Sequence, residues 1–257
     1  MNIAIVTGAS SGLGREFAVQ IAQQAVYDEI WLIARREERL LAMKERVSDK
    51  FRPIPLDLTK PESLQRLRTL LEEEKPDVGL LVNASGFGKY GTYLDLTDRE
   101  IDDMIDLNCK AVVHITYAAL PYMHDINGEH GRIITMGSAS SFQPLPEFNM
   151  YASTKAFVVH FCRALHVELK SRHISVTAVC PGYVRTAFMQ VAQDTKNPDT
   201  CQNFNPMYEP SDVVRKALRD SRKGKDMSVL GMSVKMHRLL SKLLPHRLVM
   251  KVWMKIK

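Results

Sequence analysis

Two residues in the middle of the chain have the types and the spacing that acid–base chemistry needs. Tyr151 and Lys155 are four positions apart in a stretch with helical periodicity, so both side chains lie on one helix face. A phenol ordinarily has a pKa of about 10, too high for easy proton exchange near neutrality. A neighbouring ammonium stabilises the phenolate and lowers that pKa. The pair is therefore a candidate proton donor and acceptor, although this spacing also occurs by chance.

A glycine-rich turn near the beginning of the chain is a second candidate site. Three glycines with the spacing G-x-x-x-G-x-G directly follow a short apolar run and open a helical stretch. Such glycines permit a tight turn and let backbone N–H groups approach a pyrophosphate, which the helix N-terminus also favours. The residues expected to bind it are Gly8, Ser10, Ser11, Gly12, Leu13 and Gly14. The order of strand, turn and helix predicts a nucleotide site.

The end of the second apolar run indicates which dinucleotide this site would bind. Proteins that bind NAD usually place an acidic residue about 20 residues past the turn, where it bonds the ribose hydroxyls. This chain has Ala34, Arg35 and Arg36 there instead. Guanidinium groups can pair with a 2′-phosphate, which a carboxylate would repel. We therefore expect NADP(H) rather than NAD(H); the alternative is that both arginines are solvated charges at the start of a helix.

Elements that could position these residues alternate along the chain. The expected strands are Ile3–Thr7, Ile30–Ala34, Arg52–Leu56, Val78–Asn83, Gly131–Met136, Ser175–Cys180 and Met227–Leu230. Helical patterns lie between them, near 13–25, 36–48, 61–74, 97–125, 150–172 and 211–222. Continuously apolar strands separated by helices are typical of a parallel sheet covered on both faces. The predicted fold class is a doubly wound α/β fold, a Rossmann-type sheet of about seven strands.

The chain contains no internal repeat and no low-complexity linker, so we expect a single catalytic domain over residues 1–232. Residues 183–210 are the longest segment without a clear period. A long irregular loop in a compact domain is usually functional or mobile, so this segment is the predicted substrate loop. Residues 233–257 are expected to form a basic, amphipathic helical tail.

Composition excludes several other classes of protein. The 257 residues include 35 basic and 29 acidic side chains, a net charge of +6. Seven basic residues follow Asp226, after which no acidic residue occurs, so the preceding chain is nearly neutral with 28 basic residues against 29 acidic ones. A neutral body argues against a nucleic-acid partner. The four cysteines and eight histidines lack ligand spacing, so no metal is expected. We find no signal peptide or membrane-spanning run and expect a cytoplasmic protein.

Further motifs follow in a characteristic order, and the sequence resembles the short-chain dehydrogenase/reductase family over about residues 2–190. The residues that carry the resemblance are the glycine turn, Asp57, Asn83-Ala84-Ser85-Gly86, Asn108, Ser138, Tyr151 with Lys155, and Pro181-Gly182-Tyr183-Val184-Arg185-Thr186. One motif departs from the family, which usually has Asn-Asn-Ala-Gly where this chain has Asn83-Ala84-Ser85-Gly86. The missing second amide puts the hydrogen bonds around the central strands in doubt.

The resemblance implies a catalytic group of Asn108, Ser138, Tyr151 and Lys155. Tyr151 would exchange the proton, and Lys155 would lower its pKa and bind the nicotinamide ribose. Ser138 would hydrogen-bond the substrate carbonyl, and Asn108 would hold a water linked to Lys155.

The resemblance also implies the remaining dinucleotide contacts. The adenine would meet Asp57 and Leu58. The adenosine ribose would be lined by Asn83, Ala84 and Ser85. The nicotinamide end would be seated by Pro181, Gly182, Val184 and Thr186.

Three segments should surround the reacting carbon: Phe87–Tyr93, Ala139–Asn149 and Phe188–Met207. They are rich in aromatic and aliphatic residues, which favours a moderately large apolar carbonyl compound or secondary alcohol over a small charged acid. Ketones, steroids and ketoacyl compounds all fit. The residues expected to contact substrate are Ser138, Phe142, Leu145 and Phe188.

The tail carries two apolar stripes separated by Pro245. The first, with helical spacing, is Met236, Leu239, Leu240, Leu243 and Leu244. The second, with lysines interleaved, is Val249, Val252, Trp253 and Ile256. Three interpretations stay open: helices packed on the body or a second subunit, an anchor at an anionic membrane surface, or a lid over the substrate cleft.

These observations together predict an NADP(H)-dependent oxidoreductase. It would transfer a hydride between the nicotinamide and a carbonyl or secondary alcohol carbon, with Tyr151 as general acid and base. The alternatives are a non-catalytic dinucleotide-binding scaffold or sensor, and a membrane-surface reductase anchored by the tail. A homodimer or homotetramer is expected, because oligomers are common in the family.

Overall fold

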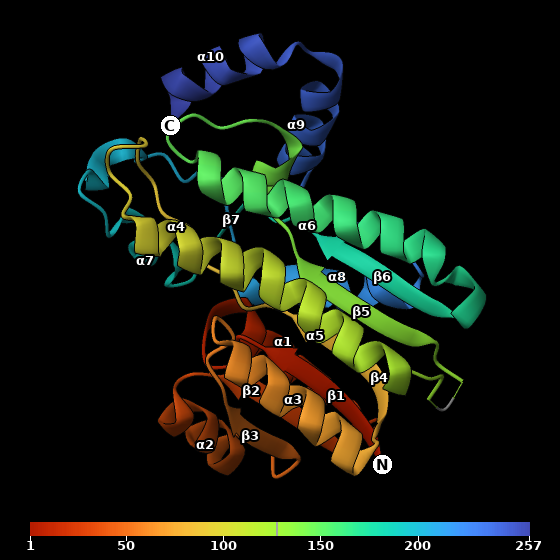
Figure 1. The fold of residues 1–257 in the computed structure, drawn as a ribbon. Coiled ribbons are helices and arrows are strands. Elements are labelled where there is room, and N and C mark those ends of the chain that lie inside the picture. Colours follow the sequence, from red (N-terminus) through yellow and green to blue (C-terminus); the bar gives the residue numbers. More distant parts are fainter. Residues whose placement is uncertain (127) are drawn as a thin grey trace.

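A parallel sheet of seven strands forms the centre of the computed structural model, which describes residues 1–126 and 128–257 (Figure 1). The strand order is β3-β2-β1-β4-β5-β6-β9. The strands are β1 (Asn2–Thr7), β2 (Glu29–Ala34), β3 (Phe51–Pro55), β4 (Asp77–Asn83), β5 (Gly131–Met136), β6 (Ile174–Val179) and β9 (Met227–Ser228). The chain starts at β1, an inner strand, and then builds the sheet outward toward both edges. The doubly wound fold class predicted from the sequence is confirmed.

Helices cover both faces of the sheet (Figure 1). One face packs against α3 (Pro61–Glu74), α5 (Ala111–Ala119) and α6 (Asn149–Glu168). The other packs against α1 (Gly12–Ala22), α2 (Glu37–Arg46) and α8 (Pro210–Arg222). Side chains alternate between the two layers along β1: Ile3 and Ile5 face the first, Ala4 and Val6 the second. Burial on both faces explains why the strands are continuously apolar.

The helical pattern expected over 97–125 corresponds to two α-helices and two short turns of other helix types. It consists of α4 (Asp98–Ile105), a π-helical turn η1 (Asp106–Lys110), α5, and a 3₁₀ turn η2 (Leu120–Tyr122). Thr97 and Glu100 form a reciprocal capping box that starts α4. π-Turns occur frequently at functional sites, and η1 contains Asn108, one of the predicted catalytic residues.

The segment 183–210 is more regular than the sequence indicates. Strand β7 (Tyr183–Val184) pairs in parallel with β8 (Met207–Tyr208), and α7 (Phe188–Gln193) and the turn η5 (Pro198–Thr200) lie between them. These elements are short, so periodicity does not reveal them. Other boundaries differ by a few residues: α6 gives way to the 3₁₀ turn η4 (Lys170–Arg172), and a 3₁₀ turn η3 (Ala139–Phe142) follows β5.

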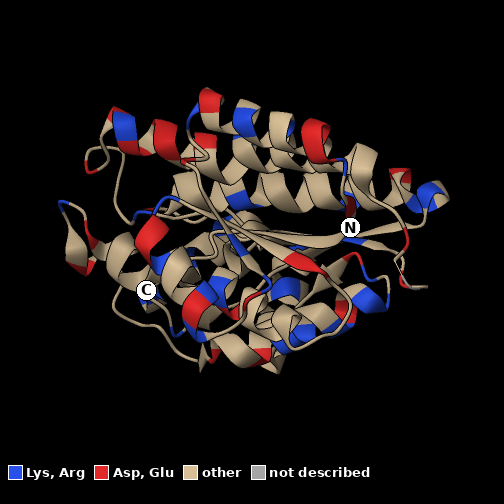
Figure 2. Cartoon of the chain, turned by 90° about the horizontal axis from the view of Figure 1, so that it is seen from below, with Lys and Arg blue, Asp and Glu red and all other residues tan. Residues whose placement is uncertain are grey.

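The last two helices, α9 (Met232–Leu243) and α10 (His246–Ile256), lie together at the top of the view in Figure 1, apart from the sheet. Pro245 separates them at the N-cap of α10. Within the described residues, no helix is both long and apolar enough to cross a membrane. Acidic and basic residues are mixed over the helices of the body (Figure 2).

Candidate active site

The glycine turn after β1 packs directly against the end of β4. Gly8 and Gly12 have φ angles of +65° and +54°, which favour glycine. A Cβ on Gly8 would lie 2.7 Å from the carbonyl oxygen of Ala84. A Cβ on Gly14 would lie closer still to the backbone carbonyl of Gly8. The turn thus depends on missing side chains, and it brings the start of α1 to the carboxyl end of the central strands.

The first turn of α1 leaves its backbone amides available to an anion. Ser11, the N-cap residue, is extended, its side chain makes no capping hydrogen bond, and the first turn contains no acidic residue. The guanidinium of Arg36 instead donates to the hydroxyls of Ser10 and Ser11, at 3.0 and 3.1 Å. Leu13 packs against the core beneath α1. The first turn of α1 therefore has room for the predicted phosphate, and binding there stays a prediction.

Three arginines gather beside this turn at the end of β2. Arg35 and Arg36 are exposed, and Arg39 follows on the first turn of α2. Partial burial and the neighbouring charges of Arg39 and Arg35 lower the pKa of Arg36. Repulsion among like charges is relieved when an anion binds between them. Arg39 was not singled out from the sequence.

The residues expected around the adenosine have mainly structural contacts. Asp57 accepts hydrogen bonds from the backbone N–H and the hydroxyl of Thr59, at 3.1 and 2.8 Å. Leu58 is buried in the core. Neither contact tests the predicted role toward adenine, which stays a prediction.

Threonine hydroxyls supply the hydrogen bonds that the altered Asn83 motif put in doubt. The Asn83 amide donates to Thr116 at 3.0 Å and to Thr135 at 3.4 Å. The Thr7 hydroxyl accepts from the backbone N–H groups of the two residues after Asn83, Ala84 and Ser85, at 3.1 and 3.2 Å. The central strands are therefore joined without a second amide side chain.

Tyr151 and Lys155 are both buried on one face of α6. Lys155 Nζ donates to the carbonyl oxygen of Met136 at 2.8 Å and lies 5.7 Å from the centre of the Tyr151 ring. Burial lowers the pKa of Lys155 to about 8. Burial raises the pKa of Tyr151, whereas a hydrogen bond with Ser138 lowers it by a smaller amount. Desolvation therefore outweighs the hydrogen bond with Ser138 in the folded protein, and the predicted effect of Lys155 on the Tyr151 pKa stays a prediction.

Asn108 is fully buried in the π-turn η1 and uses its amide to hold two segments. Its Nδ2 donates to Phe87 O at 2.8 Å and to Thr154 Oγ1 at 3.0 Å, and its Oδ1 accepts from Phe87 N at 3.1 Å. A Cβ on Gly86 would lie 2.8 Å from Asn108 Oδ1 and 3.2 Å from Lys155 Nζ. Asn108 and Lys155 therefore flank Gly86, which places Asn108 in the site.

Ser138 lies at the carboxyl end of β5, beside the tyrosine. It is the N-cap of η3, and its Oγ accepts from Ser140 N at 3.1 Å. The following residue, Ala139, donates to Pro181 O at 2.8 Å, so the segment after β6 lies against this loop.

The segment from Pro181 to Thr186 joins the catalytic and phosphate ends. A Cβ on Gly182 would lie 3.0 Å from the side chain of Val234 in α9, and Val184 is buried in β7. A Cβ on Gly12 would lie 3.6 Å from the Thr186 side chain. The segment thus passes from α9 to the glycine turn, where a bound dinucleotide would meet it.

Of the four predicted substrate residues, Ser138, Leu145 and Phe188 lie near Tyr151, whereas Phe142 packs elsewhere. The Phe188 and Phe148 rings lie 5.3 and 4.6 Å from the Tyr151 ring, between centres, and Leu145 is buried in the same apolar cluster. Phe142 instead packs edge-on against His237 of α9, with ring centres 5.9 Å apart. The sequence did not indicate that His237, a residue of the tail, would lie against Phe142.

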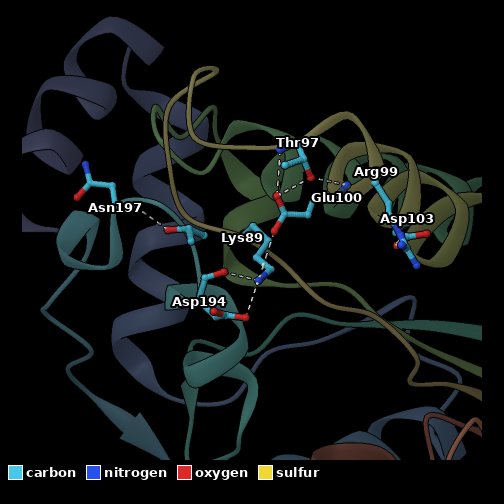
Figure 3. Close-up of polar contacts among 8 residues, drawn as sticks. Lys89, Thr97, Arg99, Glu100, Asp103, Asp194 and Asn197 are labelled. Carbon is cyan, nitrogen blue, oxygen red and sulfur yellow. Dashed lines mark hydrogen bonds and ion pairs between the residues drawn. The ribbon is translucent and has the colours of Figure 1, made fainter.

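A buried lysine ties the substrate loop to α4. Figure 3 shows Lys89 between Glu100 of α4 and Asp194 at the end of α7. Its Nζ lies 3.3 Å from Asp194 Oδ2 and 3.5 Å from Glu100 Oε1, and it also donates to the Asp194 backbone carbonyl. Nearby, Tyr90 stacks on Phe148 at 4.0 Å.

Sequence analysis missed Lys89 and assigned Trp253 no specific contact. Trp253 of α10 is buried in the cluster that contains Tyr151 and donates from its indole to Pro146 O at 2.9 Å. The one signal in the sequence is that Lys89 is the only charged residue of the apolar segment Phe87–Tyr93. In the part of the chain that the structure describes, no group of three or more His, Cys, Asp or Glu side chains could hold a metal ion.

Comparison with known proteins agrees with this architecture. The short chain dehydrogenase family model matches residues 2–197. An uncharacterized oxidoreductase of Staphylococcus epidermidis is 30% identical over 184 residues, which cover 72% of this chain and 78% of that protein. The bovine (Bos taurus) very-long-chain 3-oxoacyl-CoA reductase is 31% identical over 209 residues, covering 78% of this chain but 65% of that enzyme, so the match spans just under two thirds of its length.

A solved structure resembles nearly the whole chain. The short-chain dehydrogenase from Sphingobium yanoikuyae in complex with NADPH superposes with a TM-score of 0.79 and 26% identity, covering 98% of this chain and 96% of that one. The sheet, the glycine turn and the Tyr151–Lys155 pair therefore occur together in a chain that belongs to the short-chain dehydrogenase family.

Proposed function

We propose that this protein is an NADP(H)-dependent oxidoreductase that acts on a carbonyl or secondary alcohol carbon of a moderately large apolar compound. The observation that carries the proposal is that Ser138, Tyr151 and Lys155 lie together beside an apolar cluster. A single segment, residues 181–186, leads from there to the glycine turn. A phosphate-binding end and a proton-exchanging end are thus joined by residues 181–186.

The phosphate end supports NADP(H) as the cofactor. The available amides of α1 and the close approach at Gly8 fit a pyrophosphate. Arg35, Arg36 and Arg39 would surround a 2′-phosphate with positive charge. The Sphingobium yanoikuyae structure holds NADPH, which supports the same choice. When bound, the cofactor supplies or accepts the hydride.

The chain's own residues would move the proton. In reduction the Tyr151 hydroxyl would donate its proton to the substrate oxygen, and in oxidation the phenolate would take a proton from the alcohol. Ser138 would donate a hydrogen bond to that oxygen and stabilise its developing charge. The raised pKa keeps Tyr151 protonated near neutrality, which is the form that reduction requires. Lys155 would hold the cofactor ribose and return the proton.

The lining of the site supports an apolar substrate. Phe148 and Phe188 flank Tyr151, while Leu145 and Met189 complete the same cluster. The name of the bovine relative describes a ketoacyl thioester substrate, one of the three classes that the sequence favours. We also propose that residues 1–232 form the catalytic unit and that the protein works as a cytoplasmic homodimer or homotetramer.

The test is NADPH oxidation with a panel of apolar ketones, ketosteroids and ketoacyl thioesters. Turnover of one class, lost in Tyr151→Phe while NADPH binding is retained, is the expected result. Tyr117→Phe is the matched control, because Tyr117 is exposed on α5 away from the site. Turnover that survives in Tyr151→Phe would overturn the mechanism. Tight NADPH binding without turnover of any compound would favour the non-catalytic scaffold or sensor.

A further inference from the structure

The face of α9 that packs against the body consists of one apolar residue and two polar ones. Val234 and Ser241 are buried against the body, and His237 lies between them on the same face. The side-chain oxygen of Gln143 accepts from Ser241 Oγ at 2.7 Å and lies 2.8 Å from His237 Nε2. Specific hydrogen bonds to the loop after β5 therefore fix the rotation of α9 about its axis.

This rotation turns the apolar stripe of α9 toward solvent. The exposed side chains are Met232 (72%), Met236 (47%), Leu239 (50%), Leu240 (43%) and Leu243 (70%). The sequence left open whether Met236, Leu239, Leu240, Leu243 and Leu244 pack on the body or on a second subunit. Packing on the body is wrong for this stripe, because the opposite face of the helix packs there. Contiguous exposed apolar side chains on a soluble protein mark a contact with a partner or a membrane.

Helix α10 continues the pattern. Only Trp253 of its predicted stripe is buried, whereas Val252 and Ile256 are 48% and 55% exposed. Those two form an outward row with Leu248 at i, i+4 and i+8. A second row with the same spacing runs beside it, formed by the exposed cations Arg247, Lys251 and Lys255.

We define the tail face as the exposed apolar residues of α9 and α10 together with the exposed cations that flank them. The apolar members are Met232, Met236, Leu239, Leu240, Leu243, Leu248, Val252, Met254 and Ile256. The cationic members are Lys235, Lys242, Arg247, Lys251 and Lys255. No acidic side chain occurs after Asp226, so every charged side chain of this face is cationic.

We propose that the tail face binds the surface of an anionic lipid bilayer, with α9 and α10 lying in the interface. Amphipathic helices with apolar and basic rows insert their apolar side chains at the boundary of headgroups and acyl chains. Long lysine and arginine side chains reach from there to the lipid phosphates. Each cation near an anionic surface strengthens binding, and salt weakens it.

Charge argues against a second copy of this chain as the occupant. A two-fold contact through the tail face would bring five cationic side chains from each copy into one interface, and the face offers no acidic side chain to pair with them. Lysine is depleted at the centres of protein–protein interfaces, because its charge is costly to bury there. An anionic bilayer instead complements both the apolar and the basic rows.

The tail face also lies close to the substrate cluster. Trp253 contacts Pro146 and belongs to the cluster of Tyr151, while Lys257 pairs with Glu147. If the proposed function holds, an apolar substrate could pass from the bilayer to the site with little exposure to water. This consequence rests on the proposed function, whereas membrane binding itself does not.

The test is flotation of the full-length protein with vesicles of phosphatidylcholine, alone or mixed with phosphatidylglycerol. We expect binding to the mixed vesicles that weakens with added salt. Substituting three cations (Lys242→Gln, Arg247→Gln and Lys251→Gln) should weaken binding on the order of a hundredfold. The matched control substitutes exposed lysines of the body, Lys44→Gln, Lys60→Gln and Lys170→Gln, and should bind as the unmodified protein does.

The apolar rows have their own variant, Leu239→Gln with Leu243→Gln, and its control is Leu94→Gln with Val167→Gln on exposed sites elsewhere. Because these residues are exposed, both variants should fold, which circular dichroism checks. The tail variant should lose flotation and its control should keep it. No flotation of the unmodified protein, or equal flotation of all variants, would overturn the proposal. So would self-association without lipid that the tail variant abolishes. NADPH turnover by a protein that fails to float would leave the proposed function intact.

Discussion

At the residue scale, burial dominates the chemistry of the candidate site. Lys155 and Tyr151 are each almost wholly removed from solvent, so the uncharged form of each is favoured. The motif alone suggested a charged lysine acting on a phenol. In the folded pair, burial keeps the phenol protonated and lowers the pKa of Lys155 to about 8.

Lys155→Met should remove a pH-dependent contribution to stability. The pKa of Lys155 is about 8 when folded and about 10.5 when unfolded. Between these values the unfolded chain keeps a proton that the folded chain has released, so the contribution of Lys155 to the free energy of unfolding rises with pH. Urea unfolding from pH ~7.5 to ~9.5 should show the difference in stability shifting by about 2 kcal/mol in favour of the unmodified protein.

Comparison with a variant is essential here, because burial raises the pKa of Cys162 and Cys180, and those thiols act in the opposite direction over part of this range. Lys170→Met, at an exposed lysine, is the control and should show no such shift. A constant difference between the unmodified protein and Lys155→Met across the range would contradict the prediction.

Arg35→Asp should reverse the cofactor preference. A charge-assisted pair with the 2′-phosphate contributes about 1.5–3 kcal/mol, so the Kd for NADPH should rise roughly tenfold to a hundredfold while that for NADH changes little. Fluorescence titration with both cofactors measures this. Arg46→Asp, at the far end of α2, is the control for a general loss of positive charge. Equal weakening of both cofactors would show that Arg35 does not contact the phosphate.

At the element scale, the site depends on how loops are held against regular structure. The π-turn directs the Asn108 amide to Phe87, and Lys89 joins the same loop to α4 and α7. Both contacts link segments that are distant in sequence. The substrate loop is thereby positioned by polar contacts as well as by its apolar packing.

Lys89→Met should raise the KM for substrate more than it lowers kcat. Losing the hydrogen bonds and ion pairs of Lys89 frees α7 from α4, at a cost of about 0.5–1.5 kcal/mol, or roughly threefold to tenfold in KM. Steady-state kinetics with the substrate identified by the panel provides the measurement. Lys60→Met, at an exposed lysine, should behave as the unmodified protein. A fall in kcat alone would mean that Lys89 acts on the chemistry and not on the loop.

At the scale of the whole molecule, the tail packs against the apolar cluster that contains Tyr151. Trp253 is the one buried side chain of α10 among the described residues, and it joins that cluster. The structure thus places α10 on the body, one of the interpretations that the sequence left open, whereas a lid over the substrate cleft stays a prediction.

Trp253→Ala should detach α10. Burial of such a side chain contributes about 1.5–3 kcal/mol, so the helix should undock while the sheet stays folded. Limited trypsin digestion should then cleave faster near Arg247 and Lys251, and the KM for a bulky apolar substrate should rise. Val252→Ala, on the exposed side of the same helix, is the control. Unchanged digestion of Trp253→Ala would show that α10 is held by other contacts.

The sequence by itself determined the sheet, the glycine turn and the catalytic pair. Their signals are local: a strand buried on both faces must be apolar, a turn with φ above zero needs glycine, and residues four apart share a helix face. These features depend on the local sequence and not on contacts with distant segments, so motifs and periodicity were sufficient to predict them.

Only the tertiary structure decided the π-turn at Asn108, the partners of Lys89 and Phe142, and which face of α9 packs. Each depends on groups that are far apart in the chain. In α9, the hydrogen bonds that Gln143 Oε1 accepts from His237 and Ser241 orient the helix, so its leucines face away from the body. Periodicity identifies an apolar stripe, but whether that stripe faces the protein or its surroundings depends on contacts that exist only after folding.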